Sequence, residues 1–172
     1  MTIRDISSEK LNWVVSEIID GEFSSQLAIL IWCRWRRERE RLTQMLREKQ
    51  IPVHEIFGGQ SQKQRDSAIE SFQLDTPARR ILIAQQHSGG FGLNLTAASV
   101  AIFLSNDFSY TARIQAEDRM HRIGQNNNCL YLDILAVGPN SQRTVDHAVL
   151  EALREKRSLA DFTCKQWKRV LE

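Results

Sequence analysis

Short apolar runs alternate with amphipathic stretches along this chain of 172 residues. Several runs, among them "LAILIW" and "SVAIFL", are almost continuously apolar, which is typical of strands that are covered on both faces. A shorter run, "VHEIF", follows Pro52 and is closed by Gly58-Gly59. The sequence therefore predicts strands at residues 27–32, 53–57, 79–84, 99–104 and 129–137.

Between the strands, apolar residues recur with the spacing of one helix face. Leu11, Val14, Val15 and Ile18 form such a stripe, and Gly21 ends the helix that carries it. The sequence predicts this leading helix within residues 1–21, further helices at 36–50, 61–73 and 110–121, and C-terminal helices over 142–172.

Strands that alternate with helices predict a three-layer α/β domain, in which helices flank a mainly parallel sheet. No linker or repeat divides the sequence, so we expect residues 1–172 to form a single domain. In parallel sheets the ligand site lies outside the carboxyl ends of the strands. The Arg-rich run "RWRRERER", the Gly58-Gly59 turn, "QQHSGGFGLN" and "SNDFSY" all follow strand ends, so they should gather at one edge.

Composition narrows the class of protein only slightly. A hydrophobic content of 42%, a charged content of 26% and a net charge of +2 are ordinary for a globular domain. The three cysteines lack the spacing of a zinc site or a disulfide framework, so we expect no metal site and a reducing, intracellular compartment. No signal peptide opens the sequence, and no apolar run reaches the length of a membrane span.

The stretch "IQAEDRMHRIGQ" carries the most specific chemistry. On a helix, Gln115, Arg119 and Arg122 are spaced at i, i+4 and i+7 and share one face. Two guanidiniums on one face repel each other unless an anion lies opposite, and their planar shape fits phosphate oxygens. The face is therefore either a site for nucleotide phosphates or an exposed surface with a local pair between Asp118 and Arg122.

A second candidate is the Gly-rich stretch "HSGGFGLNLT". Its glycines and Asn94 fit either an anion cradle or a structural turn. The phosphate-loop signature GxxxxGK[ST] is absent, and no acidic cluster of the kind that holds magnesium follows a strand. Arginines without a triphosphate-binding loop indicate a nucleotide site at an interface, where they act in trans on phosphates that another domain binds.

Two long stretches carry a resemblance to one enzyme family. The segment "ILIAQQHSGGFGLNLTAASVAIFLSNDFSY", followed by "RIQAEDRMHRIGQ", resembles motifs V and VI of the Swi/Snf-type helicase-like ATPases of helicase superfamily two. The segment "LAILIWCRWRRERERLTQMLREKQIPVHEIFGGQSQKQRDSAIESFQ" resembles their motif IV region. The similarity covers about residues 10–156, and "QAEDRMHRIGQ" is its most specific part.

The resemblance implies the second RecA-like lobe of an ATP-dependent translocase or helicase that acts on double-stranded DNA. It also implies that ATP and Mg²⁺ are bound mainly by a first RecA-like lobe, which this sequence lacks. The residues that match the arginine fingers and the glutamine of motif VI are Arg119, Arg122 and Gln115. The residues that match the nucleotide-side positions of motif V are Gly90, Gly92 and Asn94.

A translocase grips the phosphate backbone largely without reading bases, so its DNA contacts are expected at the strand ends. The candidates are Arg34, Arg36, Arg37, Gln60, Ser61, Arg65, Gln85 and Gln86. The Arg-rich run also fits a solvated helix whose charge is balanced by Glu38 and Glu40. Gln85 and Gln86 stand where the family usually has Ser-Thr, so this chain does not offer the usual hydroxyl contact to DNA.

The large insertions of eukaryotic remodellers are missing, which suggests a compact bacterial or viral form, either a fragment or half of a split enzyme. We expect a cytoplasmic protein, or a nuclear one in a eukaryote, that is monomeric when isolated, bound to no membrane and inactive without the first lobe. The rival hypothesis is a non-catalytic, helicase-derived module that binds DNA or protein. Such a module has no need for Arg119 and Arg122, and both are present.

Overall fold

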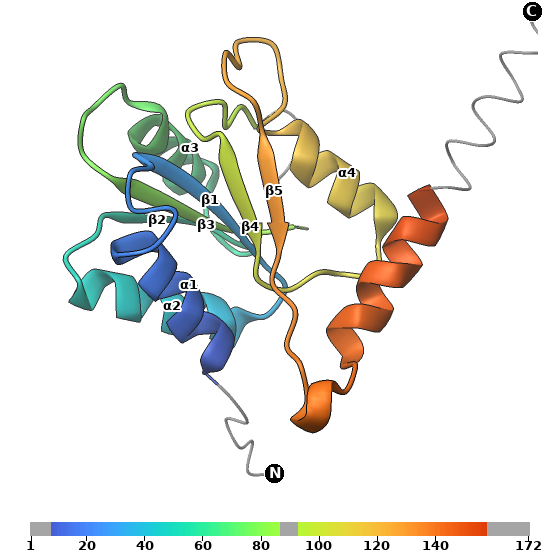
Figure 1. Cartoon of the computed structure of the whole chain (residues 1–172). Coiled ribbons are helices and arrows are strands. Elements are labelled where there is room, and N and C mark those ends of the chain that lie inside the picture. Colours follow the sequence, from blue (N-terminus) through green and yellow to red (C-terminus); the bar gives the residue numbers. More distant parts are fainter. Residues whose placement is uncertain (1–7, 87–92, 158–172) are drawn as a thin grey trace, which may run out of the picture.

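A parallel β-sheet forms the centre of the computed structural model, which describes residues 8–86 and 93–157 (Figure 1). Its five strands lie in the order β2-β3-β1-β4-β5, and all neighbouring pairs are parallel. The strands are β1 (Ala28–Cys33), β2 (Val53–Ile56), β3 (Arg80–Gln85), β4 (Val100–Phe103) and β5 (Leu130–Asp133). The predicted α/β domain with a mainly parallel sheet is therefore confirmed.

The central strands are buried on both faces, as their continuous apolar runs predicted. All six residues of β1 are buried. Leu30 in β1 lies beside Leu82 in β3 and Ala101 in β4 in the parallel register. Because aligned side chains on neighbouring strands point to the same face, these three residues form part of one apolar layer.

Helices cover both faces of the sheet (Figure 1). They are α1 (Glu9–Ile19), α2 (Arg36–Glu48), α3 (Gln62–Gln73) and α4 (Tyr110–Asp118). On one face, Val14 of α1 and Leu42 of α2 belong to the same apolar cluster. On the other face, Phe72 of α3 and Ala116 of α4 belong to a second cluster. The sheet is thus the middle layer of three, as predicted.

A further helix at residues 145–157 follows β5 and contacts α4 and the residues just before it. Its Lys156 Nζ donates a hydrogen bond of 2.7 Å to the carbonyl oxygen of Phe108. Arg157 Nη1 lies 3.8 Å from the Glu117 carboxylate of α4. This helix belongs to the C-terminal region that the sequence predicted to be helical, of which residues 158–172 lie outside the described residues.

The helix α4 ends earlier than the sequence pattern predicted. We expected a helix to residue 121, but α4 ends at Asp118 and the chain continues in turns. The carbonyl oxygen of Arg119 accepts a hydrogen bond from the amide of Leu95, at 2.9 Å, in place of an amide further along the helix. Gly124, with a φ of 101°, adopts the left-handed conformation that glycine tolerates best. The turn is therefore fixed by a contact from a distant segment.

Within residues 8–86 and 93–157, no helix is long and apolar enough to cross a membrane. The same part of the chain holds no group of three His, Cys, Asp or Glu side chains placed to bind a metal ion. Cys33 is buried and Cys129 is half-buried, and both are free thiols. Apolar packing and polar contacts therefore hold the described part of the domain together.

We predict that Glu55→Gln destabilises the fold without altering its shape. The Glu55 carboxylate in β2 accepts hydrogen bonds from Arg39, from Thr43 Oγ1 at 3.0 Å and from Arg47 Nη2 at 3.2 Å. Arg39 is buried, and its other acidic partner, Glu40, is exposed and lies 3.4 Å away. The substitution therefore removes the main counter-charge of Arg39 and should lower the free energy of unfolding by about 2 to 4 kcal/mol. Urea denaturation measures this change; a loss below about 0.5 kcal/mol, the level of an ordinary surface substitution, contradicts the assignment.

Candidate functional site

The carboxyl edge of the sheet gathers the segments that follow β1, β2, β3 and β4. Gln85 at the end of β3 donates from Nε2 to the Arg34 carbonyl oxygen at 3.4 Å and accepts from the Gly58 amide at 3.4 Å. The Arg34 amide donates to Ser105 Oγ at 2.8 Å. Residues from four strand ends are therefore in direct contact, as the parallel sheet requires.

Arg34 is the cation most closely built into this edge. Its Nε lies 3.3 Å from Asp107 Oδ2, and its side chain is 31% exposed. The guanidinium carbon lies 4.6 Å from the centre of the Trp35 ring and 6.0 Å from that of Phe108, within the range of cation–π attraction. Arg34 is thus held in place while part of it stays accessible to an anion.

The rest of the Arg-rich run divides between surface and interior. Arg36 Nε lies 2.6 Å from Glu40 Oε1, one helical turn away, and its side chain is 80% exposed. Arg37 is exposed as well, whereas Arg39 is buried against Glu55. Arg36 therefore has a local acidic partner and also faces solvent.

Gln60 and Ser61 shape the turn that follows β2. Gln60 accepts from the Phe57 amide at 2.9 Å and donates to the Glu55 carbonyl oxygen at 3.0 Å. Ser61 begins α3, and its Oγ accepts from the Gln64 amide at 3.3 Å in a capping box. Arg65, half-buried one turn later, has a buried Nε with no hydrogen-bond partner in the described part of the chain. Arg65 therefore has an N–H donor that makes no hydrogen bond within the described residues, whereas the side chains of Gln60 and Ser61 are engaged in the turn.

Gln86 follows β3 and is buried, with 8% exposure. Its Nε2 donates to Asn106 Oδ1 at 3.2 Å, and its Oε1 accepts from the Asp107 amide at 3.0 Å. Both ends of the amide are thus engaged inside the protein. In this arrangement Gln86 supports the loop after β4.

A buried ionic cluster lies next to Gln86 and was not foreseen from the sequence. Arg113 in α4 binds both carboxylate oxygens of Asp133, at 2.5 and 3.2 Å, and its Nε donates to Glu117 at 2.7 Å. Its guanidinium carbon lies 3.5 Å from the centre of the Phe103 ring. The i, i+4 spacing of Arg113 and Glu117 was a visible signal, but Asp133 lies 20 residues from Arg113 in the sequence.

A half-buried acid, Glu38, supports the edge from α2. Glu38 accepts a hydrogen bond of 2.5 Å from Ser105 Oγ, the same oxygen that binds the Arg34 amide. Burial raises the pKa of Glu38, and the Ser105 hydrogen bond and the positive charge of Lys10 offset part of this effect. Lys10 Nζ binds the Leu104 carbonyl oxygen at 2.9 Å and Asp146 at 2.6 Å. The loop after β4 is therefore held by α1 and α2 as well.

The residues of motif VI lie at the opposite end of α4 from this edge. The helix starts beside the carboxyl edge, where Ser109 caps it, and runs back along the sheet (Figure 1). Arg119 follows its last residue and is half-buried, and Arg122 is exposed. Gln115 is exposed on the helix one turn before Arg119. Since the helix ends at Asp118, Arg122 is placed by the following turn and not by a shared helical face.

The segment before β4 packs against this end of α4. Leu95 binds the Arg119 carbonyl, and Arg122 Nη1 donates to the Leu93 carbonyl oxygen at 3.2 Å. Gln125 Nε2 donates to the carbonyl oxygens of Thr96 at 3.2 Å and Ala98 at 2.7 Å. The end of motif V and the end of motif VI are thus joined, and Gln125 is a structural residue that the sequence left unexplained.

Asn94 is exposed, and its Oδ1 accepts from the Thr96 amide at 3.3 Å, which forms a local Asx-type turn. Gly90 and Gly92 lie outside the described residues. The predicted site residues thus fall into two groups. One lies along the carboxyl edge, around Arg34, and the other lies at the far end of α4, around Arg119.

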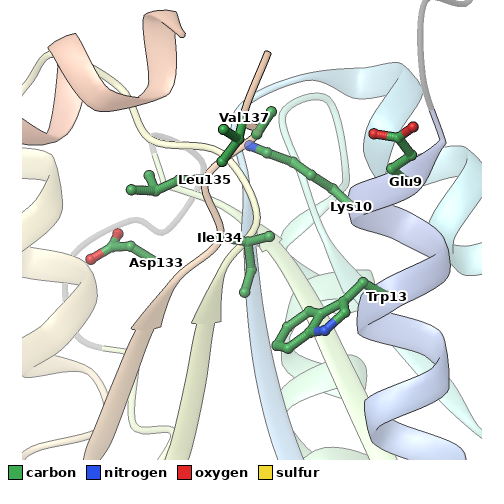
Figure 2. A pocket seen from close by; sticks show the side chains of 8 residues that line it. Glu9, Lys10, Trp13, Asp133, Ile134, Leu135 and Val137 are labelled. Carbon is green, nitrogen blue, oxygen red and sulfur yellow. The ribbon is translucent and has the colours of Figure 1, made fainter. Parts of the chain in front are cut away.

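A pocket of 470 Å³ lies between α1 and the segment that follows β5 (Figure 2). Trp13 and Lys10 of α1 lie across it from Ile134 and Val137, and Leu135 also lines it. None of the residues that line it is a predicted site residue, and Lys10 is already engaged by Leu104 and Asp146. The pocket is therefore separate from both groups of predicted site residues.

Comparison with known proteins agrees with this fold. The helicase conserved C-terminal domain model matches residues 9–124. The DNA repair protein RAD5 of Candida glabrata is 29% identical over 84% of this chain and 12% of that protein. An uncharacterized ATP-dependent helicase of Schizosaccharomyces pombe is 33% identical over 89% of this chain and 14% of that protein. The crystal structure of the C-terminal part of the Fun30 ATPase domain gives a TM-score of 0.68 at 23% identity, over 84% of this chain and 44% of that chain.

A five-stranded parallel sheet with motif VI at the end of α4 defines a RecA-like helicase lobe. The chain belongs to the helicase C-terminal domain family, in its Swi/Snf-type branch, as the resemblance predicted. It spans 12% and 14% of the length of the two relatives named above. The chain therefore corresponds to one domain's length of these much longer proteins.

We predict a pH-dependent role for Glu38 in stability. The raised pKa means that the folded protein holds this proton more tightly than the unfolded chain does. The resulting stabilisation is fully present below the ordinary pKa of 4.5 and is lost as the pH rises through the folded-state pKa. Urea denaturation of the wild type and of Glu38→Gln at a series of pH values should show the wild type gaining most at acidic pH. A constant difference between the two proteins contradicts the prediction.

Proposed function

We propose that this chain is the second lobe of an ATP-dependent translocase or helicase of double-stranded DNA. It supplies arginine fingers to an ATP site that a first RecA-like lobe completes. The observation that carries the proposal is the joining of Leu93, Leu95, Arg119 and Arg122 at the surface-exposed end of α4. Two cations and the end of the Gly-rich motif meet there.

The residues present fit part of a nucleotide site. Arg122 is exposed and Arg119 half-buried, and a guanidinium at the surface can bind phosphate oxygens in a planar, two-pronged geometry. Gln115 lies one turn earlier, where it would orient the arginines or the attacking water. The sequence carries no phosphate-binding loop, so ATP and Mg²⁺ would be held mainly by the first lobe. Gly90, Gly92 and Asn94 would contribute from the motif V side.

In catalysis, arginines of this kind neutralise the negative charge that develops on the transferred phosphoryl group. Their benefit depends on placement, because a guanidinium that is displaced by an ångström loses much of its effect. The backbone contact between Leu95 and Arg119 and the contact between Arg122 and Leu93 hold both residues in place. The chain would therefore contribute no turnover by itself and full turnover only when the first lobe closes on it.

DNA would bind along the carboxyl edge of the sheet. Arg34, Arg37 and Arg65 offer accessible or unsatisfied guanidinium groups there, and Arg36 adds an exposed charge. Such contacts attract the phosphate backbone with little sequence preference. Gln60, Ser61 and Gln85 would shape the edge, since hydrogen bonds within the protein occupy their side chains. In a cell, the protein would act in the cytoplasm, or in the nucleus of a eukaryote, and would be monomeric when isolated.

We predict that Arg119→Ala and Arg122→Ala each lower DNA-stimulated ATP turnover of the enzyme assembled from both lobes by on the order of a thousandfold. The affinity for DNA should stay the same, because both residues lie away from the carboxyl edge. A suitable control is Arg143→Ala, an exposed arginine outside the predicted site residues that pairs with Glu151. Unchanged turnover in Arg122→Ala contradicts the finger assignment and favours a non-catalytic binding module.

We predict that Arg34→Ala weakens DNA binding by this chain about equally for all sequences and reduces the slope of log affinity against log salt by about one. Fluorescence anisotropy with a labelled duplex at several salt concentrations measures both quantities. Arg143→Ala, with the same loss of one positive charge, should leave the slope unchanged. An equal change in the two variants would show that binding is diffuse and not located at the carboxyl edge.

A further inference from the structure

A continuous series of polar contacts leads from the carboxyl edge into the interior. Arg34 Nε lies 3.3 Å from Asp107 Oδ2. The Asp107 amide donates to Gln86 Oε1 at 3.0 Å, and Gln86 Nε2 donates to Asn106 Oδ1 at 3.2 Å. A half-exposed cation at the proposed DNA-binding edge is therefore three contacts away from the side chain of Asn106.

Asn106 joins this series to the buried ionic cluster of α4. Its Oδ1 also accepts from Arg113 Nη1 at 3.0 Å, and its Nδ2 donates to Asp133 Oδ1 at 2.6 Å. The same amide oxygen thus serves both Gln86 and Arg113. Because hydrogen bonds that share a group polarise and position one another, a change at Gln86 affects how Arg113 is held.

Arg113 is fixed firmly to its own helix. It is 9% exposed, its Nε binds Glu117 one turn further along, and its guanidinium lies over the Phe103 ring of β4. A displacement of Arg113 is therefore a displacement of α4 against the sheet. Arg119 directly follows the last residue of α4 and moves with it.

The start of α4 is attached to the same loop. Asp107 Oδ1 accepts from the Ser109 amide at 3.0 Å, and Ser109 Oγ caps the helix by accepting from the Ala112 amide at 3.2 Å. Asp107 is thus bound to Arg34 on one side and to the first turn of α4 on the other. A phosphate that draws Arg34 away from Asp107 would leave the Asp107 carboxylate, which also binds the first turn of α4, without the positive charge of Arg34 beside it.

We propose that Asn106 and Arg113 are positioning residues that couple DNA binding at the carboxyl edge to the placement of Arg119 at the far end of α4. The inference rests on the proposed function, since it assigns a connection between its two sites. The edge and the finger lie at opposite ends of α4, so an effect of DNA that passes through this lobe has to cross the structure between them. The contacts through Asn106 provide a continuous, part-buried connection of this kind.

Asn106→Ala tests the connection most cleanly. It removes the group that links Gln86 to Arg113 and leaves the Arg113–Asp133 pair in place. In the enzyme assembled from both lobes, ATP turnover without DNA should stay within about twofold of the wild type, while stimulation by duplex DNA should fall by about tenfold. The measured quantity is the ratio of kcat with saturating DNA to kcat without DNA, together with DNA affinity, which should not change.

Glu55→Gln is the matched control, because it disturbs a buried ionic cluster of α2 and β2 that has no contact with α4 in the described residues. It should lose stability and keep the full stimulation ratio. Gln86→Ala should reduce the ratio as Asn106→Ala does, and the double variant should be no worse than either single one, since both remove the same contact.

The outcomes separate the inference from the proposed function. If the wild-type enzyme shows no stimulation by DNA, the proposed function fails and the inference fails with it. If the wild type is stimulated and Asn106→Ala is stimulated equally, only the inference is overturned. A reduction of similar size in Glu55→Gln, or additive effects of the Gln86 and Asn106 substitutions, also overturns it, because either result indicates general destabilisation.

Discussion

Parallel pairing of buried strands is the constraint on which the remaining structure depends. Each pair of neighbours in the sheet is parallel, so all five strands end at the same edge. The burial of apolar side chains on both faces fixes this register, because a slip of one residue would turn them toward the wrong cluster. Polar residues that follow the strands are therefore brought together whatever their separation in the sequence. Arg34 and Ser105 lie 71 residues apart and are in contact.

The parallel sheet also separates the two groups of predicted site residues, one at the carboxyl edge and one at the far end of α4. A helix that connects parallel strands has to run back along the sheet, so residues at its end lie far from those at its start. In α4 this places Ser109 beside the carboxyl edge and Arg119 at the opposite end. A protein that responds to DNA at one end and acts on a nucleotide at the other requires a stiff connection between them. By our proposal, the part-buried contacts of Arg113 with Asp133 and Glu117 would make α4 such a connection.

Much of the fold could be predicted from the sequence because strands buried on both faces leave an unmistakable apolar pattern, as in β1, where all residues are buried. The arginines of motif VI could also be chosen as candidate site residues from the sequence, because their spacing and the adjoining "HRIGQ" lie within one short stretch. The end of α4 could not be predicted, because the Arg119 carbonyl is bound by Leu95 from another segment. The engagement of Gln86 and the Arg113–Asp133 pair were missed for the same reason, since each depends on partners that only the folded sheet brings near.

The central claim is that Arg119 and Arg122 recognise charge on a phosphoryl group that another lobe holds. Its most direct test is the affinity of this chain for the isolated first lobe, measured by calorimetry with ADP and Mg²⁺ and then with aluminium fluoride added to mimic the transferred phosphoryl group. Our account predicts that the mimic tightens the association of the wild-type chain and leaves that of an Arg119→Ala, Arg122→Ala double variant unchanged. Equal tightening in both proteins, or none in either, would contradict it.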